Sequence, residues 1–95
     1  MSMKEAYEQK LQAQLDEWGA EIDKLKAKAD SAEADVQLKY YKQIEQLQSM
    51  KDTAVDKLIE LKDTGDDAWE DLKAGIENAW DSLGSVLNSF ASKFK

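Results

Sequence analysis

Apolar residues recur every three or four positions along most of this chain, with polar and charged residues between them. In the first part the steps alternate between four and three, and the apolar positions are, in order, Leu11, Leu15, Trp18, Ile22, Leu25, Ala29, Ala32 and Val36. This spacing is the heptad pattern of a coiled coil. The residues in between are largely Gln, Asp, Glu and Lys, as the solvated face of a helix requires. The pattern therefore predicts a long coiled-coil helix.

The pattern loosens in the middle of the chain but does not stop. The apolar positions continue at Tyr40, Ile44, Leu47, Met50, Ala54, Leu58 and Leu61. Here the steps from Val36 to Leu47 add up to eleven residues, which corresponds to about 3.67 residues per turn and a straighter course than a strict heptad gives. We expect one helix to run through both regions.

Local signals set the expected ends of this helix. Ser2 and Glu5 form the S-x-x-E pattern of a capping box, which predicts a helix beginning at Met3. Gly65 can take the left-handed conformation that ends helices, and Asp67 with Glu70 offers a new N-cap and its partner. The sequence thus predicts a helix over residues 3–64, a break at 64–67 and a second helix over 68–92. The first helix would be about 90 Å long at ~1.5 Å per residue.

An alternative concerns the stretch KADSAEAD, Lys28 to Asp35, which has the smallest side chains of the long helix. It contains no Gly or Pro, and alanine is the best helix former, so we favour a continuous helix. A turn at residues 29–33 would instead give a three-helix bundle.

The second helix carries an eleven-residue repeat. Residues 68–78 read AWEDLKAGIEN and residues 79–89 read AWDSLGSVLNS. Eleven residues make almost three whole turns, so Trp69 and Trp80 lie on nearly the same side of the helix. The other members of this apolar stripe are Leu72, Ile76, Leu83, Leu87 and Phe90.

These stripes predict an all-α protein that associates with itself, with a dimer as the expected state. A 90 Å helix cannot bury its stripe against a short partner alone, so copies of the chain would cover one another. The expected interface consists of Leu15, Trp18, Ile22, Leu25, Val36, Tyr40, Leu47, Leu58, Leu61, Trp69, Leu72, Ile76, Trp80, Leu83, Leu87 and Phe90. Two other partners stay open. Trp and Phe on the stripe of residues 68–94 also suit a membrane surface, although the opposite face is acidic, and another helical protein could cover the stripe.

Charge and composition narrow the functional classes. The chain of 95 residues has 13 basic residues, all lysine, against 20 acidic ones, for a net charge of −7. An acidic chain without arginine is a poor ligand for nucleic acid. Cysteine and histidine are absent, and no glycine-rich phosphate loop or calcium-loop pattern occurs. We therefore expect no cofactor, no metal site and no catalytic residues. The start of the chain does not read as a secretory signal, so the expected location is the cytoplasm.

Two segments carry a resemblance to a known group of proteins. They are YEQKLQAQLDEWGAEIDKLKAKADSAEAD, from Tyr7 to Asp35, and AWEDLKAGIENAWDSL, from Ala68 to Leu83. Both resemble small bacterial coiled-coil proteins of uncharacterised function, some of which are described as stress-response proteins. The resemblance implies a cytoplasmic helical protein with no assigned reaction. Together with the apolar pattern, it favours a non-catalytic, self-associating structural protein with a protective role under stress; a peripheral membrane protein is the alternative.

Overall fold

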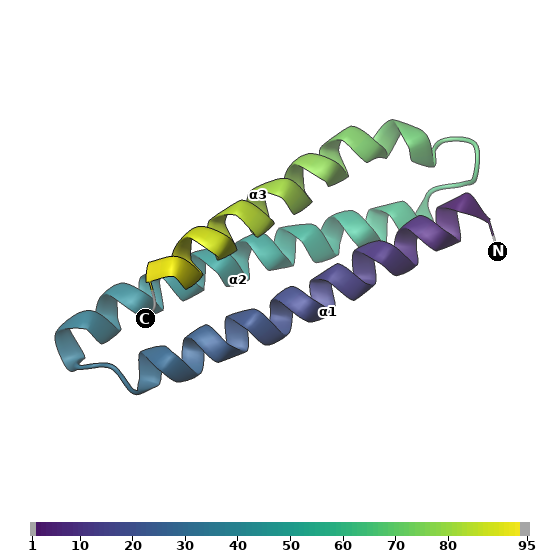
Figure 1. The fold of residues 1–95 in the computed structure, drawn as a ribbon. Coiled ribbons are helices and arrows are strands. Elements are labelled where there is room, and N and C mark those ends of the chain that lie inside the picture. The colour runs from purple at the N-terminus through teal and green to yellow at the C-terminus, as the bar shows by residue number, and fades with distance from the viewer. Residues whose placement is uncertain (1, 94–95) are drawn as a thin grey trace.

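The computed structural model describes residues 2–93, which form a bundle of three helices in which the second helix along the chain is antiparallel to the first and the third (Figure 1). Helix α1 spans Met3–Asp30, α2 spans Ala34–Asp63 and α3 spans Lys73–Lys93, and a short 3-10 turn, η1, spans Trp69–Leu72. No strand occurs among the described residues. The expected all-α fold is therefore confirmed, in the form of the three-helix alternative.

The expected start of the first helix is also confirmed. Ser2 is the N-cap of α1, and its side-chain oxygen accepts a hydrogen bond from the Glu5 backbone N–H at 3.1 Å. Ser2 Oγ lies 3.4 Å from Glu5 Oε1 as well. This side-chain cap satisfies one of the backbone donors that a helix leaves open at its first turn.

The prediction of a continuous helix over residues 3–64 is wrong, because the chain turns back at Ser31–Glu33. The molecule measures 52 × 20 × 18 Å instead of forming a 90 Å rod. Ser31 ends α1, and its backbone N–H bonds to the Lys28 and Ala29 carbonyls. Beyond the turn, the Val36 and Gln37 backbone N–H groups bond to the Glu33 carbonyl.

The turn forms without a helix-breaking residue because tertiary packing outweighs the helix propensity of alanine. Folding back lets the apolar stripe of α1 face that of α2 within one chain, which a straight helix cannot do. The turn also regains polar contacts across its two sides. Gln37 Nε2 donates to the Asp30 carbonyl at 3.3 Å, and the Tyr41 hydroxyl donates to Asp30 Oδ1. Helix propensity does not include these tertiary contacts, which is why it favours a continuous helix through this stretch.

The break after α2 lies where it was expected, but its geometry differs. Thr64 leaves the helix with an extended backbone, φ −87° and ψ 139°, and its hydroxyl donates to the Glu60 carbonyl at 2.7 Å. Gly65 has no positive φ, so the prediction that it ends the helix in the left-handed conformation is wrong. Because Thr64 already redirects the chain, Gly65 does not need that conformation.

The helix expected to begin at residue 68 begins instead with η1. Ala68, and not Asp67, occupies the N-cap position of this turn, with no side-chain cap. The α-helical hydrogen bonding starts at Lys73. The tighter 3-10 turn still brings Trp69 inward, where its side chain is 5% exposed.

A single hydrophobic core runs along the bundle and receives side chains from all three helices. Fifteen of the described residues are buried, and all of them are apolar. They are Leu11, Leu15, Ile22, Leu25, Ala29, Ile44, Leu47, Ala54, Leu58, Leu61, Trp69, Ile76, Trp80, Leu83 and Leu87. Since one chain buries its own apolar stripes, burial of these stripes does not require a second copy, contrary to the expectation from the sequence.

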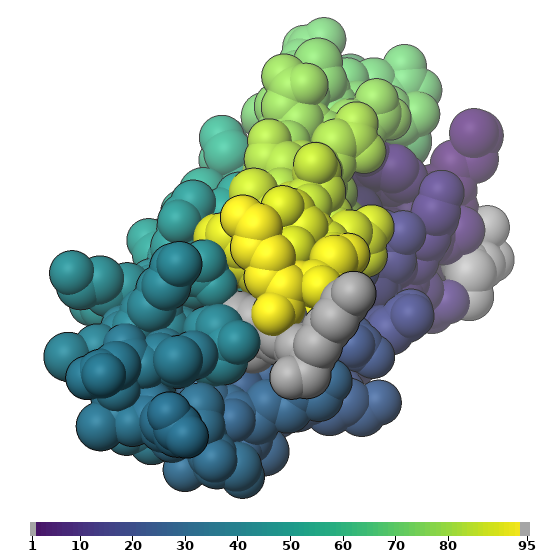
Figure 2. Space-filling model, turned by 60° about the vertical axis from the view of Figure 1, so that its left-hand side comes forward, coloured from purple at the N-terminus to yellow at the C-terminus, as the bar shows by residue number. Residues whose placement is uncertain are grey.

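Helix α3 is the shortest of the three, and the turn between α1 and α2 projects beyond its end (Figure 1). In Figure 2 the yellow end of α3 stops above the blue turn. Among the described residues, the bundle thus has three helices over most of its length and two at the end that carries Ser31–Glu33.

Candidate functional site

Most residues expected at an interface between chains lie in the core of one chain. Eleven of the sixteen are buried: Leu15, Ile22, Leu25, Leu47, Leu58, Leu61, Trp69, Ile76, Trp80, Leu83 and Leu87. Four are partly buried against that core, namely Trp18, Tyr40, Leu72 and Phe90. Val36 is 39% exposed, because it stands at the two-helix end of the bundle. The pattern found the apolar faces, but it could not tell a partner helix in the same chain from one in another copy.

An aromatic and cationic cluster joins α1, η1 and α3. The rings of Tyr7 and Trp69 have centroids 5.6 Å apart and are tilted by 42°. Lys73 Nζ lies 4.5 Å from the Trp69 ring centroid and 5.5 Å from that of Tyr7. A cation at this distance over an aromatic face is attracted by the ring quadrupole. Neither Tyr7 nor Lys73 was predicted as a site residue from the sequence. Tyr7 lies one helical turn before Leu11, and this spacing is the signal that would have indicated it.

Two glycines lie close to a side chain from a neighbouring helix. At Gly84 on α3, an added Cβ would lie 3.1 Å from Cζ2 of Trp18 on α1. At Gly19 on α1, an added Cβ would lie 3.0 Å from Lys51 Nζ of α2. The missing side chain at Gly84 therefore leaves room for an indole ring from α1, whereas the flexible end of Lys51 can move away from residue 19.

Three buried polar atoms among the described residues have no hydrogen-bond partner: the Tyr7 hydroxyl, Trp80 Nε1 and Gln43 Oε1. Tyr7 and Trp80 both line a groove of about 270 Å³ between α1 and α3, with Lys10, Gln14 and Glu77 beside them. Burial, with a smaller contribution from the Glu77 carboxylate, raises the pKa of Tyr7 above its ordinary value of 10.0. The phenol is therefore neutral at physiological pH and remains without a partner.

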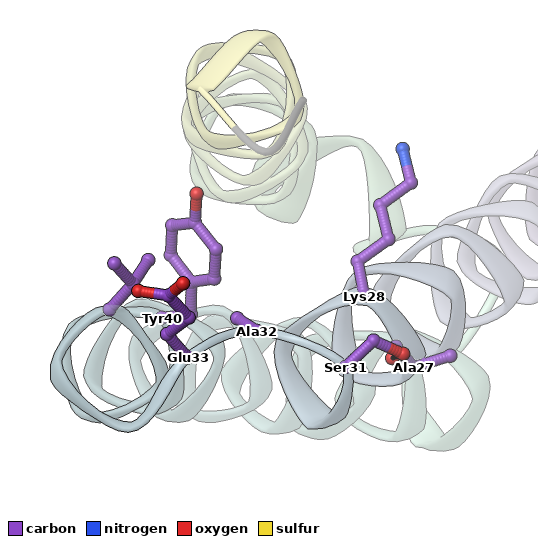
Figure 3. A pocket seen from close by; sticks show the side chains of 7 residues that line it. Ala27, Lys28, Ser31, Ala32, Glu33 and Tyr40 are labelled. Atoms are coloured by element: carbon purple, nitrogen blue, oxygen red, sulfur yellow. Dashed lines mark hydrogen bonds between the residues drawn. The ribbon is translucent and has the colours of Figure 1, made fainter.

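A hollow of about 580 Å³ lies at the two-helix end of the bundle (Figure 3). It is lined by Ala27, Lys28, Ser31, Ala32, Glu33, Val36 and Tyr40. In Figure 3 the Lys28 and Tyr40 side chains rise from α1 and α2 toward the end of α3. The Tyr40 hydroxyl donates to the Lys93 carbonyl at 3.5 Å. This contact ties the last turn of α3 to α2.

Residues 2–93 contain few features of a metal-binding or catalytic site. No group of three or more acidic side chains in this range could hold a metal ion, and no charged side chain in it is buried. The ion pairs are exposed or bordering ones, such as Lys4–Glu8 and Lys24–Glu21, each at 3.6 Å. None of the helices in this range combines the length and apolar character needed to cross a bilayer.

Comparison with protein-family models, curated protein sequences and solved structures gave no match for this chain. The resemblance carried by residues 7–35 and 68–83 therefore stays a hypothesis.

Proposed function

We propose that this chain is a non-catalytic structural and interaction protein, which acts through contacts made by its helices. The observation that supports this is the division of its side chains: every buried residue in the described range is apolar, and the titratable groups lie at the surface or its border. An active site usually needs polar groups that converge in a concave, sheltered pocket. This bundle gives its interior to packing instead.

Self-association of folded bundles is the first form that we propose for these contacts. Large apolar side chains are exposed toward both ends of the molecule: Val36, Leu38 and Tyr41 near one end, and Met3 and Ile59 near the other. Leu38 is 67% and Ile59 51% exposed. End-to-end contact would remove these side chains from water, so the expected assembly is longer than one bundle and no wider.

Light scattering on a sizing column with small-angle X-ray scattering tests this proposal. Association should give particles about twice the 52 Å length of one bundle. The variant Ile59→Gln should weaken association, whereas the neighbouring exposed change Glu60→Gln is the matched control. A monomer at all concentrations, or equal association of both variants, would refute end-to-end contact. A protective role under stress rests only on the resemblance, and suppression of heat aggregation of a model enzyme by the chain would test it.

Reversible binding to a lipid surface is a second candidate, supported by the placement of charge around the helices. On α2, at about 100° per residue, the lysines that border the apolar face within about 80° of its centre are Lys39, Lys51, Lys57 and Lys62. Lys42, the remaining lysine of α2, lies farther from the centre of the apolar face. The acidic residues of α2 lie about 120–180° away, on the opposite side. Bordering lysines can extend their amines to water while their stems cover apolar surface.

On α3, Lys73 also borders the stripe, whereas Glu77 and Asp81 lie beside Tyr7 and Trp80 at the groove with α1. Flotation with phosphatidylcholine vesicles tests the lipid candidate. Binding should be weakened by Trp80→Asp, and the exposed change Ser82→Asp, which adds the same charge outside the stripe, is the control. Absence of flotation for the unchanged chain would refute the candidate.

A further inference from the structure

The interface between α1 and α3 buries polar atoms without satisfying them. The Tyr7 hydroxyl on α1 and Trp80 Nε1 on α3 have almost no accessible surface and no hydrogen-bond partner, and both side chains line the same groove. Trp80 is only 4% exposed. A buried donor that finds no acceptor loses its hydrogen bonds to water without replacement, so these two atoms weaken the closed interface.

Chain topology makes this interface the easiest one to separate. A short turn at Ser31–Glu33 joins α1 to α2, and residues 64–68 join α2 to η1 and α3. No turn joins α1 directly to α3. Separation of α1 from α3 therefore requires rotation at the two turns only, while α1 stays beside α2 and α2 stays beside α3.

We propose that the bundle opens along the α1–α3 interface and lays its apolar helix faces on a zwitterionic lipid surface. This inference rests on the second candidate function and names the movement by which the buried faces would reach lipid. All buried side chains in the described range are apolar, so these are the side chains that the opened faces would lay on the acyl region. Lys10, Glu77 and Asp81, which border the α1–α3 groove, would stay at the level of the headgroups.

A lipid–water boundary supplies what Tyr7 and Trp80 lack in the closed bundle. Tyrosine and tryptophan favour such boundaries because the ring lies in an apolar layer while the O–H or N–H bonds to headgroups or water. The net charge of −7 repels anionic headgroups, which is why the surface we propose is zwitterionic.

Specific contacts hold the bundle closed in the absence of lipid. The Tyr7–Trp69–Lys73 cluster joins α1 to η1 and the first residue of α3. Further along, the Trp18 indole lies against Gly84. Opening has to break both contacts, so we expect the closed bundle in solution and the open form only on the surface.

Distance measurements between spin labels test the opening directly. The chain has no cysteine, so labels attach only where cysteines are introduced. The pair Ala13→Cys and Asn78→Cys reports α1 to α3, and the pair Ala13→Cys and Asp56→Cys reports α1 to α2; all three positions are exposed. Packed helices lie about 8–10 Å apart, so side-by-side helices should lengthen the α1–α3 distance by about 10 Å. The α1–α2 distance should not change.

The measurements are made with and without phosphatidylcholine vesicles, alongside flotation of the same labelled chains. Flotation with only the α1–α3 distance lengthened supports the proposal. Flotation with unchanged distances refutes the opening and leaves the lipid candidate intact. Flotation with both distances lengthened also refutes it, since the hairpin would have separated too. No flotation refutes the lipid candidate and this proposal together.

A second variant tests the role assigned to the unpartnered atoms. Tyr7→Phe removes the unsatisfied hydroxyl and keeps the ring, so it should stabilise the closed bundle and weaken vesicle binding by about fivefold or more. Tyr41→Phe is the control, because Tyr41 is exposed at the α1–α2 turn, away from the α1–α3 interface. Vesicle binding of Tyr7→Phe that equals or exceeds that of the unchanged chain would contradict the proposed role of Tyr7.

Discussion

The indole of Trp18 on α1 lies against the backbone of α3 at Gly84, where a Cβ would come within 3.1 Å of Cζ2. Gly84 lies inside α3 with a helical backbone, so space, and not an unusual φ, accounts for the glycine there. In a helix interior, glycine costs about 0.5–1 kcal/mol relative to alanine. The bundle accepts this cost where a large ring from another helix needs the room.

Two glycines of α3 should therefore respond differently to substitution. At Gly75 the nearest neighbour of an added Cβ is Lys57 Nζ at 4.0 Å, so Gly75→Ala should raise the free energy of unfolding by about 0.5–1 kcal/mol. Gly84→Ala should gain less than Gly75→Ala, and Gly84→Leu should lose about 1–3 kcal/mol through overpacking. Urea unfolding measures all three. Equal gains from the two alanine variants would show that the Trp18 contact imposes no restriction.

The cation over the aromatic pair gives a second prediction. Lys73→Met keeps an unbranched stem but removes the charge 4.5 Å from the Trp69 ring. We expect a loss of about 0.5–1 kcal/mol in the free energy of unfolding, because the lysine amine is partly shielded by the cluster. Lys24→Met, whose side chain is 72% exposed and pairs only loosely with Glu21, is the control and should change little. The same loss in both variants would remove the special role of Lys73.

The apolar spacing was sufficient to predict the all-α class. The capping pattern of Ser2 with Glu5 predicted the first residue of α1, and the signals at Gly65 and Asp67 predicted a break near Thr64, although not its geometry. These signals could not predict the turn at Ser31–Glu33, because no residue there breaks a helix. Only the packing of α1 on α2 and the bonds from Gln37 and Tyr41 to Asp30 explain that turn. The same limit applies to the candidate site. Periodicity identified Trp69 and Trp80, but Lys73 over the Trp69 ring and the unpartnered Trp80 Nε1 depend on three-dimensional neighbours.

A pH titration should show that Tyr7 and Tyr41 each lose their proton at a higher pH than a free phenol does. Burial raises the pKa of Tyr7, and the hydrogen bond to Asp30 is the main cause of the raised pKa of Tyr41. The unfolded chain gives up these protons near pH 10, before the native chain does. The resulting stability is thus fully present below pH 10 and falls as the pH rises through the native pKa values. Ultraviolet difference titration of the unchanged chain, Tyr7→Phe and Tyr41→Phe would assign each step. A step near pH 10 that disappears in Tyr7→Phe would contradict the buried environment of Tyr7.

The most direct prediction concerns whether one chain is the folding unit. Leu61 is fully buried and Ile59, two residues away on α2, is 51% exposed. Leu61→Ala should cost about 2–5 kcal/mol, since it leaves a cavity in the core, whereas Ile59→Ala should stay within about 0.5 kcal/mol. At concentrations where the unchanged chain is a single bundle, its thermal midpoint should not depend on chain concentration, because the core that Leu61 joins is complete within one copy. A midpoint that rises with concentration, together with a large loss for Ile59→Ala, would show instead that the stable fold requires a second chain covering the outer face of α2.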